Sequence, residues 1–159
     1  MYVSTGLAQV DYQDQLEDYI NKVNDGTYPS GRLVRLAVRR HLMDLEYGPA
    51  RGLRWDGEVA ADACKFFPLL KHSTSTFAGT PFELRAFQVF IVSMLFGWKA
   101  WDAAAPNGGA WYRRFREALV TFAKGNGKSP LAAAIALKAV FADGEERAEG
   151  YCYGTKRDQ

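Results

Sequence analysis

Residues 124–129, with the sequence Lys-Gly-Asn-Gly-Lys-Ser, combine the groups that are needed to bind a nucleoside triphosphate. Gly125 and Gly127 permit a tight backbone whose N–H groups point toward phosphate oxygens. Lys128 supplies an ammonium group for the β and γ phosphates, and Ser129 supplies a hydroxyl that holds Mg²⁺. The segment therefore predicts a phosphate-binding loop.

The elements predicted on either side of this loop are those that it needs. Residues 118–123 (ALVTFA) form an apolar run of strand length, and an Ala-rich helix is expected over residues 128–143. Phosphates would then lie at the start of a helix, where the positive end of the helix dipole favours anions. A second strand over residues 150–154 (GYCYG) would complete a βαβ unit with parallel strands.

The loop departs from the strict pattern G-x-x-x-x-G-K-[ST]. That pattern requires glycine at position 122, where the chain has Phe122. The triplet Gly-Lys-Ser alone is a weak indication of a phosphate-binding loop. Most of the evidence comes from its position between a predicted strand and a predicted helix. From the residues alone, the alternative is a Gly-Asn-Gly turn, with Lys128 and Ser129 as solvated residues of the first helical turn.

Two amphipathic helices are predicted near the amino terminus. The first covers residues 10–23 and stops before an Asn-Asp-Gly turn. The second is expected to be capped by Ser30 and to end at Gly48 and Pro49. Its repeating pattern runs through Leu33, Leu36, Ala37, Arg40 and Leu42. The same helix carries the densest basic cluster, which is either a phosphate contact or a solvated face: Arg32, Arg35, Arg39 and Arg40.

Two further helices are predicted before the loop. Asp56 is the expected cap of a helix that reaches Lys71, and residues 83–98 form a helix beginning after Pro81. The expected buried side of the earlier helix holds Val59, Ala60, Ala63, Cys64, Phe66, Phe67 and Leu70, and that of the later helix holds Leu84, Phe87, Ile91 and Leu95.

The composition is that of one soluble globular domain. Hydrophobic residues make up 48% of the 159 residues and charged residues 24%, while a net charge of +2 is too small to indicate nucleic-acid binding. No run of 18 apolar residues or secretory signal occurs, which predicts a cytosolic protein with no membrane partner. Neither the cysteines (Cys64, Cys152) nor the histidines (His41, His72) have ligand spacing, so we expect reduced cysteines and no zinc site.

The loop resembles that of the large terminase subunits of tailed bacteriophages, whose deviant form is basic-x-N-G-K-[ST]. Residues 79–88 with 95–98 look like the adenine-binding element of that family, with Gln88 as its glutamine. Residues 112–116 look like its basic lead-in to the loop, and residues 155–159 resemble its T-x-x-x-Q stretch. The similarity spans residues 55–159.

This resemblance implies a role for each site residue. Lys128 would neutralise charge on the phosphates, Lys124 would be a second cation near the γ phosphate, and Ser129 would hold Mg²⁺. Gln88 would hydrogen-bond adenine, unless it is an exposed helical glutamine. Arg113, Arg114 and Arg116 would reach phosphate or a neighbouring subunit, or else form a solvated approach to the strand. The nucleotide-binding set is Gln88, Lys124, Gly125, Asn126, Gly127, Lys128, Ser129 and Pro130.

The implied fold is α/β, with an incomplete P-loop NTPase-type parallel sheet over residues 55–159 preceded by a helical region over residues 1–54. The implied protein binds ATP and Mg²⁺ and drives DNA into viral capsids as a homo-oligomeric ring. Its partners would be double-stranded DNA, the capsid portal and a small terminase subunit. It would act in the host cytoplasm, transiently at the procapsid portal.

No acid after Ser129 follows an apolar strand as an ATPase requires, and the family's nuclease domain is also missing. We therefore expect a fragment that binds nucleotide weakly and hydrolyses it poorly. A helicase-type P-loop ATPase is one alternative, since it also has an adenine-reading glutamine. The other is a non-catalytic helical interaction module.

Overall fold

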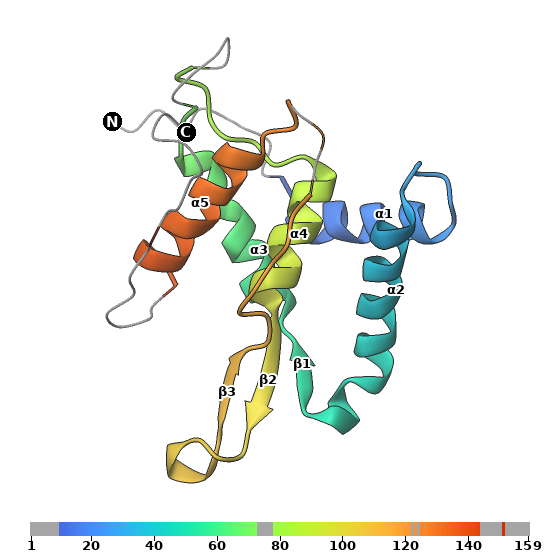
Figure 1. Cartoon of the computed structure of the whole chain (residues 1–159), viewed down its shortest axis with the longest axis vertical. Helices are drawn as coiled ribbons and strands as arrows, with labels where there is room; N and C mark the ends of the chain where they lie inside the picture. The colour runs from blue at the N-terminus through green and yellow to red at the C-terminus, as the bar shows by residue number, and fades with distance from the viewer. Residues whose placement is uncertain (1–9, 73–77, 122, 124, 144–150, 152–159) are drawn as a thin grey trace.

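The computed structural model describes residues 10–72, 78–121, 123, 125–143 and 151. Within them the chain has an α/β fold, with a small three-stranded sheet below a group of helices (Figure 1). Helix α4 (Ala86–Gly97) lies in the middle, between α1 (Tyr12–Asn24) and α2 (Arg32–Tyr47) on one side and α3 (Gly57–Lys65) and α5 (Lys128–Phe141) on the other.

The sheet is antiparallel and lies upstream of the loop. Its order is β1 (Leu53–Trp55), β2 (Trp98–Asp102), β3 (Ala110–Arg113), and the last two form a hairpin that projects from the helices (Figure 1). The hairpin turn contains the 3₁₀ helix η3 (Pro106–Gly108). The flanking strands are rich in aromatic residues, which favour strands: Trp98, Trp101, Trp111 and Tyr112.

The predicted strand over residues 118–123 is wrong for its described residues. Residues 118–121 and 123 belong to no strand, and Phe122 lies outside the described residues. An extended segment needs a neighbour for its backbone hydrogen bonds and a core for its apolar side. Leu119 is 96% exposed, so this run has no such core. The expected second strand, 150–154, lies outside the described residues except for Tyr151, and the described part contains no parallel strand pair.

The first helix is confirmed, and the cap of the second is corrected. Asp11 caps α1 by accepting hydrogen bonds from the N–H groups of Gln13 and Asp14. Helix α2 has Gly31 as its N-cap and no side-chain cap, so Ser30 lies one residue too early.

Helix α2 buries only part of the expected face, since Ala37 and Leu42 pack against the core but Leu33 and Leu36 do not. Its buried residues are Val38, His41 and Asp44, whereas Leu33 is 78% and Leu36 46% exposed. Two polar residues are on the buried side because each has a hydrogen-bond partner, which the apolar pattern cannot reveal.

Asp56 caps α3 as predicted, by accepting a hydrogen bond from the Val59 N–H at 3.1 Å. The helix ends at Lys65 rather than Lys71. The 3₁₀ helix η2 (Phe67–Leu69) follows, and Pro68, which has no N–H to donate, prevents the α-helix from continuing.

Helix α4 begins at Ala86, later than expected, and Pro81 instead forms an isolated bridge with Lys71. It buries most of its circumference because it lies at the centre. Of the expected face, Leu84 lies before the helix and is buried, whereas three residues are only half-buried: Phe87, Ile91 and Leu95.

The core surrounds α4 and includes residues from both ends of the chain. Val23 of α1, Val89 and Val92 of α4, and Leu131 of α5 are at most 1% exposed. Cys64 is a buried free cysteine, as expected, and burial raises the pKa of its thiol to about 11. Cys152 lies outside the described residues.

Two buried polar contacts join α2 to the sheet region. The Trp98 indole N–H donates a hydrogen bond to Nδ1 of His41 at 3.1 Å. Asp44 accepts a hydrogen bond from Arg114 at 2.7 Å and also pairs with Arg51. Burial alone would raise the pKa of Asp44, but the two arginines hold it below its usual value. These contacts fix α2 against residues about 57 and 70 positions further along the chain.

Candidate nucleotide-binding site

The loop before α5 has a backbone that only glycine adopts readily. Gly125 has a φ of +90° and Gly127 a φ of +69°, both in the left-handed region. The Lys128 ammonium donates a hydrogen bond to the carbonyl oxygen of Ala123 at 3.3 Å, so the loop turns back on itself. Lys124 lies outside the described residues. A curled glycine loop of this kind directs backbone N–H groups into a small concavity.

Helix α5 begins at Lys128, where the sequence placed its start. Gly127 is the N-cap, and its carbonyl oxygen accepts the first helical hydrogen bond, from Leu131, at 3.1 Å. Leu131 and Ala134 are buried and hold the helix on the core. Pro130 is tolerated because first-turn N–H groups have no helical partner. The exposed Ser129 hydroxyl therefore sits at the positive end of the helix.

Gln88 lies beside this loop although 39 positions separate it from Gly127. Its side chain is buried, at 5% exposure, so it is not an exposed helical glutamine. Its Oε1 accepts a hydrogen bond from the Arg85 N–H at 2.9 Å. A Cβ atom on Gly127 would lie 3.7 Å from Nε2 of Gln88. Gln88, which was expected to bind adenine, and the predicted phosphate loop thus lie close together, at the starts of α4 and α5.

Contacts at the other end of α5 hold it against the hairpin. Arg113 forms an ion pair with Asp143, and Lys138 lies 5.4 Å from the ring centroid of Phe96. Burial, together with the nearby Arg113, lowers the pKa of Lys138. Since these groups come from β3, α4 and α5, they set the direction in which α5 leaves the loop.

The three arginines of the basic lead-in have different environments. Arg113 and Arg114 are engaged within the protein, with Asp143 and Asp44 respectively, so neither is a solvated approach to the loop. Arg116 is exposed, and its guanidinium lies 6.0 Å from the ring centroid of Tyr112. Sequence reasoning missed both acidic partners, since nothing in the spacing of Asp44 or Asp143 indicates a distant arginine.

The loop region leaves room for a bound triphosphate. At Gly125, no atom lies within 4 Å of the position that a Cβ would occupy, which leaves open space beside the loop. No group of three or more His, Cys, Asp or Glu side chains in the described residues is arranged to hold a metal. A magnesium ion would therefore depend on the Ser129 hydroxyl, phosphate oxygens and water, which is how this ion is held in many nucleotide sites.

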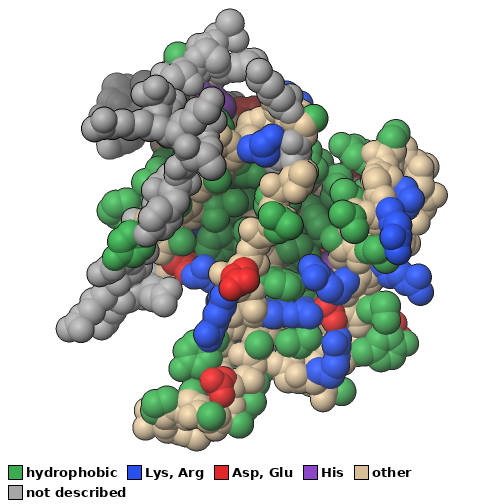
Figure 2. Space-filling view, in the orientation of Figure 1, with side chains coloured by type: hydrophobic (Ala, Val, Ile, Leu, Met, Phe, Trp, Pro, Cys, Tyr) green, Lys and Arg blue, Asp and Glu red, His purple; other side chains and the backbone are tan. Residues whose placement is uncertain are grey.

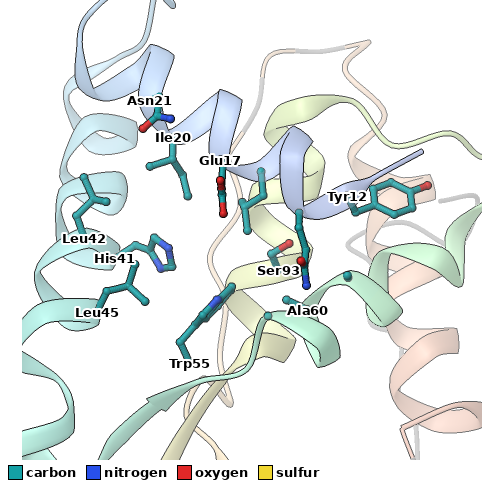
Figure 3. Close-up of a pocket in the computed structure, with 14 residues that line it drawn as sticks. Tyr12, Glu17, Ile20, Asn21, His41, Leu42, Leu45, Trp55, Ala60 and Ser93 are labelled. Atoms are coloured by element: carbon teal, nitrogen blue, oxygen red, sulfur yellow. The ribbon is translucent and has the colours of Figure 1, made fainter. Parts of the chain in front are cut away.

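Away from the loop, a cavity lies between α1, α2, β1, α3 and α4 and is lined by Glu17, His41, Trp55 and Ser93, among others (Figure 3). None of the lining residues is Lys or Arg, and none belongs to the phosphate loop. A cavity with no cation in its lining does not suit a triphosphate. No helix in the described part of the chain is long and apolar enough to span a membrane.

A glycine loop at the start of a helix is an arrangement that can bind phosphate groups. Residues 86–159 match the family model described as terminase large subunit, ATPase domain. This part of the chain is similar to that family, as the resemblance in the sequence predicted. A search of curated proteins and a search of solved structures found no match.

The match begins with the first residue of α4 and includes the hairpin, the loop and α5. The matched model is that of an ATPase domain of a terminase large subunit, so the match points to a DNA-packaging ATPase.

Proposed function

We propose that the loop over residues 124–129 binds the triphosphate of ATP at the start of α5. Gly125 and Gly127 support the proposal, because their positive φ values curl the chain without strain. Lys128 would exchange its hydrogen bond to Ala123 for one to the phosphates, and Lys124 would add a second cation. Asn126 completes the turn between the two glycines.

Ser129 and Pro130 complete the proposed site. Ser129 would hold Mg²⁺ through its hydroxyl, and Pro130 would fix the first turn of α5. When bound, ATP with Mg²⁺ supplies the phosphoryl group whose transfer to water powers the motor. The chain itself supplies positioning and positive charge, both of which stabilise negative charge on the phosphates.

Gln88 would select adenine in this proposal. Its Nε2 can donate a hydrogen bond, and Oε1 can accept a second one beside that from Arg85, because an amide oxygen has two lone pairs. The observation that carries the proposal is the short separation between Gln88 and Gly127. A non-catalytic module would have no need to bury a glutamine amide beside a glycine loop.

We further propose that the protein acts in a motor that translocates double-stranded DNA. It would work as a homo-oligomeric ring on the capsid portal, in the host cytoplasm, with a small terminase subunit and with a nuclease activity in the full-length protein. Residues 1–54 would be an amino-terminal helical region and residues 55–159 the first part of the ATPase domain. The family match favours this function over a helicase-type ATPase.

Lys128→Ala tests the nucleotide site. Titration with ATP and Mg²⁺, followed by calorimetry or NMR, should show affinity reduced by about 10-fold or more, since a charge-assisted hydrogen bond contributes about 1.5–3 kcal/mol. Lys65→Ala is the matched control, because this exposed lysine lies on α3, outside the loop, and pairs with Asp62. Equal affinity of Lys128→Ala and the unmodified chain would favour the non-catalytic module.

Gln88→Ala tests base selection separately. This variant should lose the preference for ATP over GTP while its affinity for tripolyphosphate stays unchanged. If the variant kept its preference for ATP, the role of Gln88 in adenine selection would be refuted, but the proposed phosphate-binding loop would be unaffected.

A further inference from the structure

The cavity between α1, α2, β1, α3 and α4 is large enough for a small molecule (Figure 3). Its volume is about 400 Å³, which lies within the range of sites that bind small ligands. Of the described residues that line it, only Ser93 belongs to the part of the chain that matches the terminase ATPase model. The cavity is therefore separate from the proposed nucleotide site, and its own side chains indicate what it binds.

His41 gives the cavity a hydrogen-bond donor. Its Nδ1 accepts the indole N–H of Trp98 at 3.1 Å, so the ring proton is on Nε2. The side chain is 4% exposed, and within the described part of the chain Nε2 donates to no acceptor. Because Nε2 is not fully enclosed by protein and His41 lines the cavity, this N–H group borders the open space. A buried N–H group that lacks an acceptor costs free energy, so the site favours a ligand that supplies one.

Glu17 gives the cavity a negative charge at its mouth. This residue of α1 is exposed, whereas His41 and Ser93 are at most 4% exposed, so the carboxylate lies at the mouth and the donor lies deeper. Glu17 forms no ion pair with another described residue. Figure 2 shows Lys and Arg side chains gathered across the middle of one face, and no Lys or Arg is among the described residues that line the cavity. The mouth therefore attracts a cation.

The walls between these polar groups are mainly apolar. Figure 3 shows Glu17, His41, Trp55 and Ser93 around one space. The Trp55 ring packs edge-on against His41, with centroids 4.9 Å apart, and offers a flat surface to a planar ligand. Aliphatic side chains complete the walls: Leu16, Ile20, Leu42, Leu45, Ala60 and Ala61.

We propose that this cavity binds a small aromatic amine that carries an oxygen at the far end of its ring. The ammonium group pairs with Glu17 at the mouth, and the ring lies beside Trp55 between the aliphatic walls. The ring oxygen accepts the hydrogen bond from Nε2 of His41. Each polar group of the ligand thus meets a group of opposite hydrogen-bonding character.

The same arrangement disfavours two other classes of ligand. An anion would meet the Glu17 carboxylate at the mouth and no lining Lys or Arg to pair with. The amino terminus of a peptide would place its ammonium at Glu17, but the rest of the chain would then have to leave past the buried His41 and Ser93. A compact amine avoids both difficulties.

Tyramine is the probe, and NMR titration of the labelled chain at constant pH and ionic strength is the measurement. Tyramine should bind with a Kd of about 1 mM, the affinity expected for a ligand of this size. It should shift the indole N–H of Trp55 and the backbone amides of Ala60 and Ser93, and leave residues 125–129 unchanged. Phenethylamine lacks the ring oxygen and 4-hydroxyphenylethanol lacks the ammonium group, so each should bind about fivefold more weakly.

Glu17→Gln tests the charge at the mouth. This variant should bind tyramine about fivefold more weakly, a loss kept modest by the exposure of the carboxylate, and should no longer prefer tyramine to 4-hydroxyphenylethanol. Asp14→Asn is the matched control, because Asp14 is an exposed acid of α1 that does not line the cavity. It should bind tyramine as the unmodified chain does, and circular dichroism checks that both variants are folded.

Three results would overturn the proposal. The first is no saturable shift at the cavity residues below about ten times the expected Kd. The second is equal affinity for tyramine, phenethylamine and 4-hydroxyphenylethanol, which would show that the ring enters without using either polar group. The third is an equal loss of tyramine binding in Glu17→Gln and Asp14→Asn, which would show that only the overall charge of α1 matters.

Discussion

The hydrogen bond between Trp98 and His41 should make the stability of the protein depend on pH. His41 is 4% exposed and accepts the Trp98 indole proton at Nδ1, which requires a neutral ring. Burial is the main cause that lowers the pKa of His41 to about 4, with Arg40 adding to the effect and Asp44 opposing it. In the unfolded chain the pKa returns to about 6.5.

The sign and size follow from this difference. Between pH 6.5 and 4 the unfolded chain binds a proton at His41 that the folded protein does not bind, so the free energy of unfolding falls as the pH falls. Each pKa unit corresponds to about 1.36 kcal/mol, which gives a loss of about 3 kcal/mol across this window. Above pH 6.5 this contribution is fully present.

Urea unfolding followed by tryptophan fluorescence at several pH values measures the loss. His41→Asn is the informative variant, because its Oδ1 can accept the Trp98 proton and it cannot itself titrate. At each pH, the free energy of unfolding of the unmodified chain is subtracted from that of the variant. This difference should change by about 3 kcal/mol between pH 7 and 4, because the carboxyl groups contribute equally to both proteins and cancel. His72→Asn, which removes the chain's other histidine, should keep the dependence. The reasoning would be refuted if the free energies of unfolding of His41→Asn and the unmodified chain differed by the same amount at every pH from 7 to 4.

Two further predictions concern the fold. Asp44→Asn should lower the free energy of unfolding by about 2 kcal/mol in the urea assay, because the largely buried Arg114 loses its carboxylate. A change below about 0.5 kcal/mol would contradict a stabilising role of this ion pair. Gly97→Ala should cost about 1–3 kcal/mol by overpacking, because its Cβ would lie 2.6 Å from Trp55 Cζ3 and 2.9 Å from Ala60 Cβ. Thermal unfolding measures the latter, and a Tm equal to that of the unmodified chain would show that α4 and β1 are less closely packed than described.

Local signals in the sequence predicted the elements that form locally. The cap at Asp56, the start of α5 at Lys128 and the need for glycine at 125 and 127 each depend on a few neighbouring residues, and each is found. The faces of α2 and α4 were predicted less well. Their burial depends on distant partners, such as Trp98 for His41, which no periodicity contains.

The sheet was mispredicted because strands are selected by their neighbours. Residues 118–121 have a strand-like composition but no described partner, whereas the short strand β1 pairs with β2 over only three residues. At the site, the motif identified Gln88 and the loop, but their proximity is a property of the packing of α4 and α5.

The most direct test of the nucleotide site is a pair of NMR titrations of the labelled chain, with ATP and with tripolyphosphate, each with Mg²⁺. Both ligands should shift the backbone amides of residues 125–129, and ATP alone should also shift the side-chain amide of Gln88. Shifts that avoid the loop, or that appear at Gln88 with tripolyphosphate as strongly as with ATP, would contradict a triphosphate held by the loop and an adenine held by the glutamine.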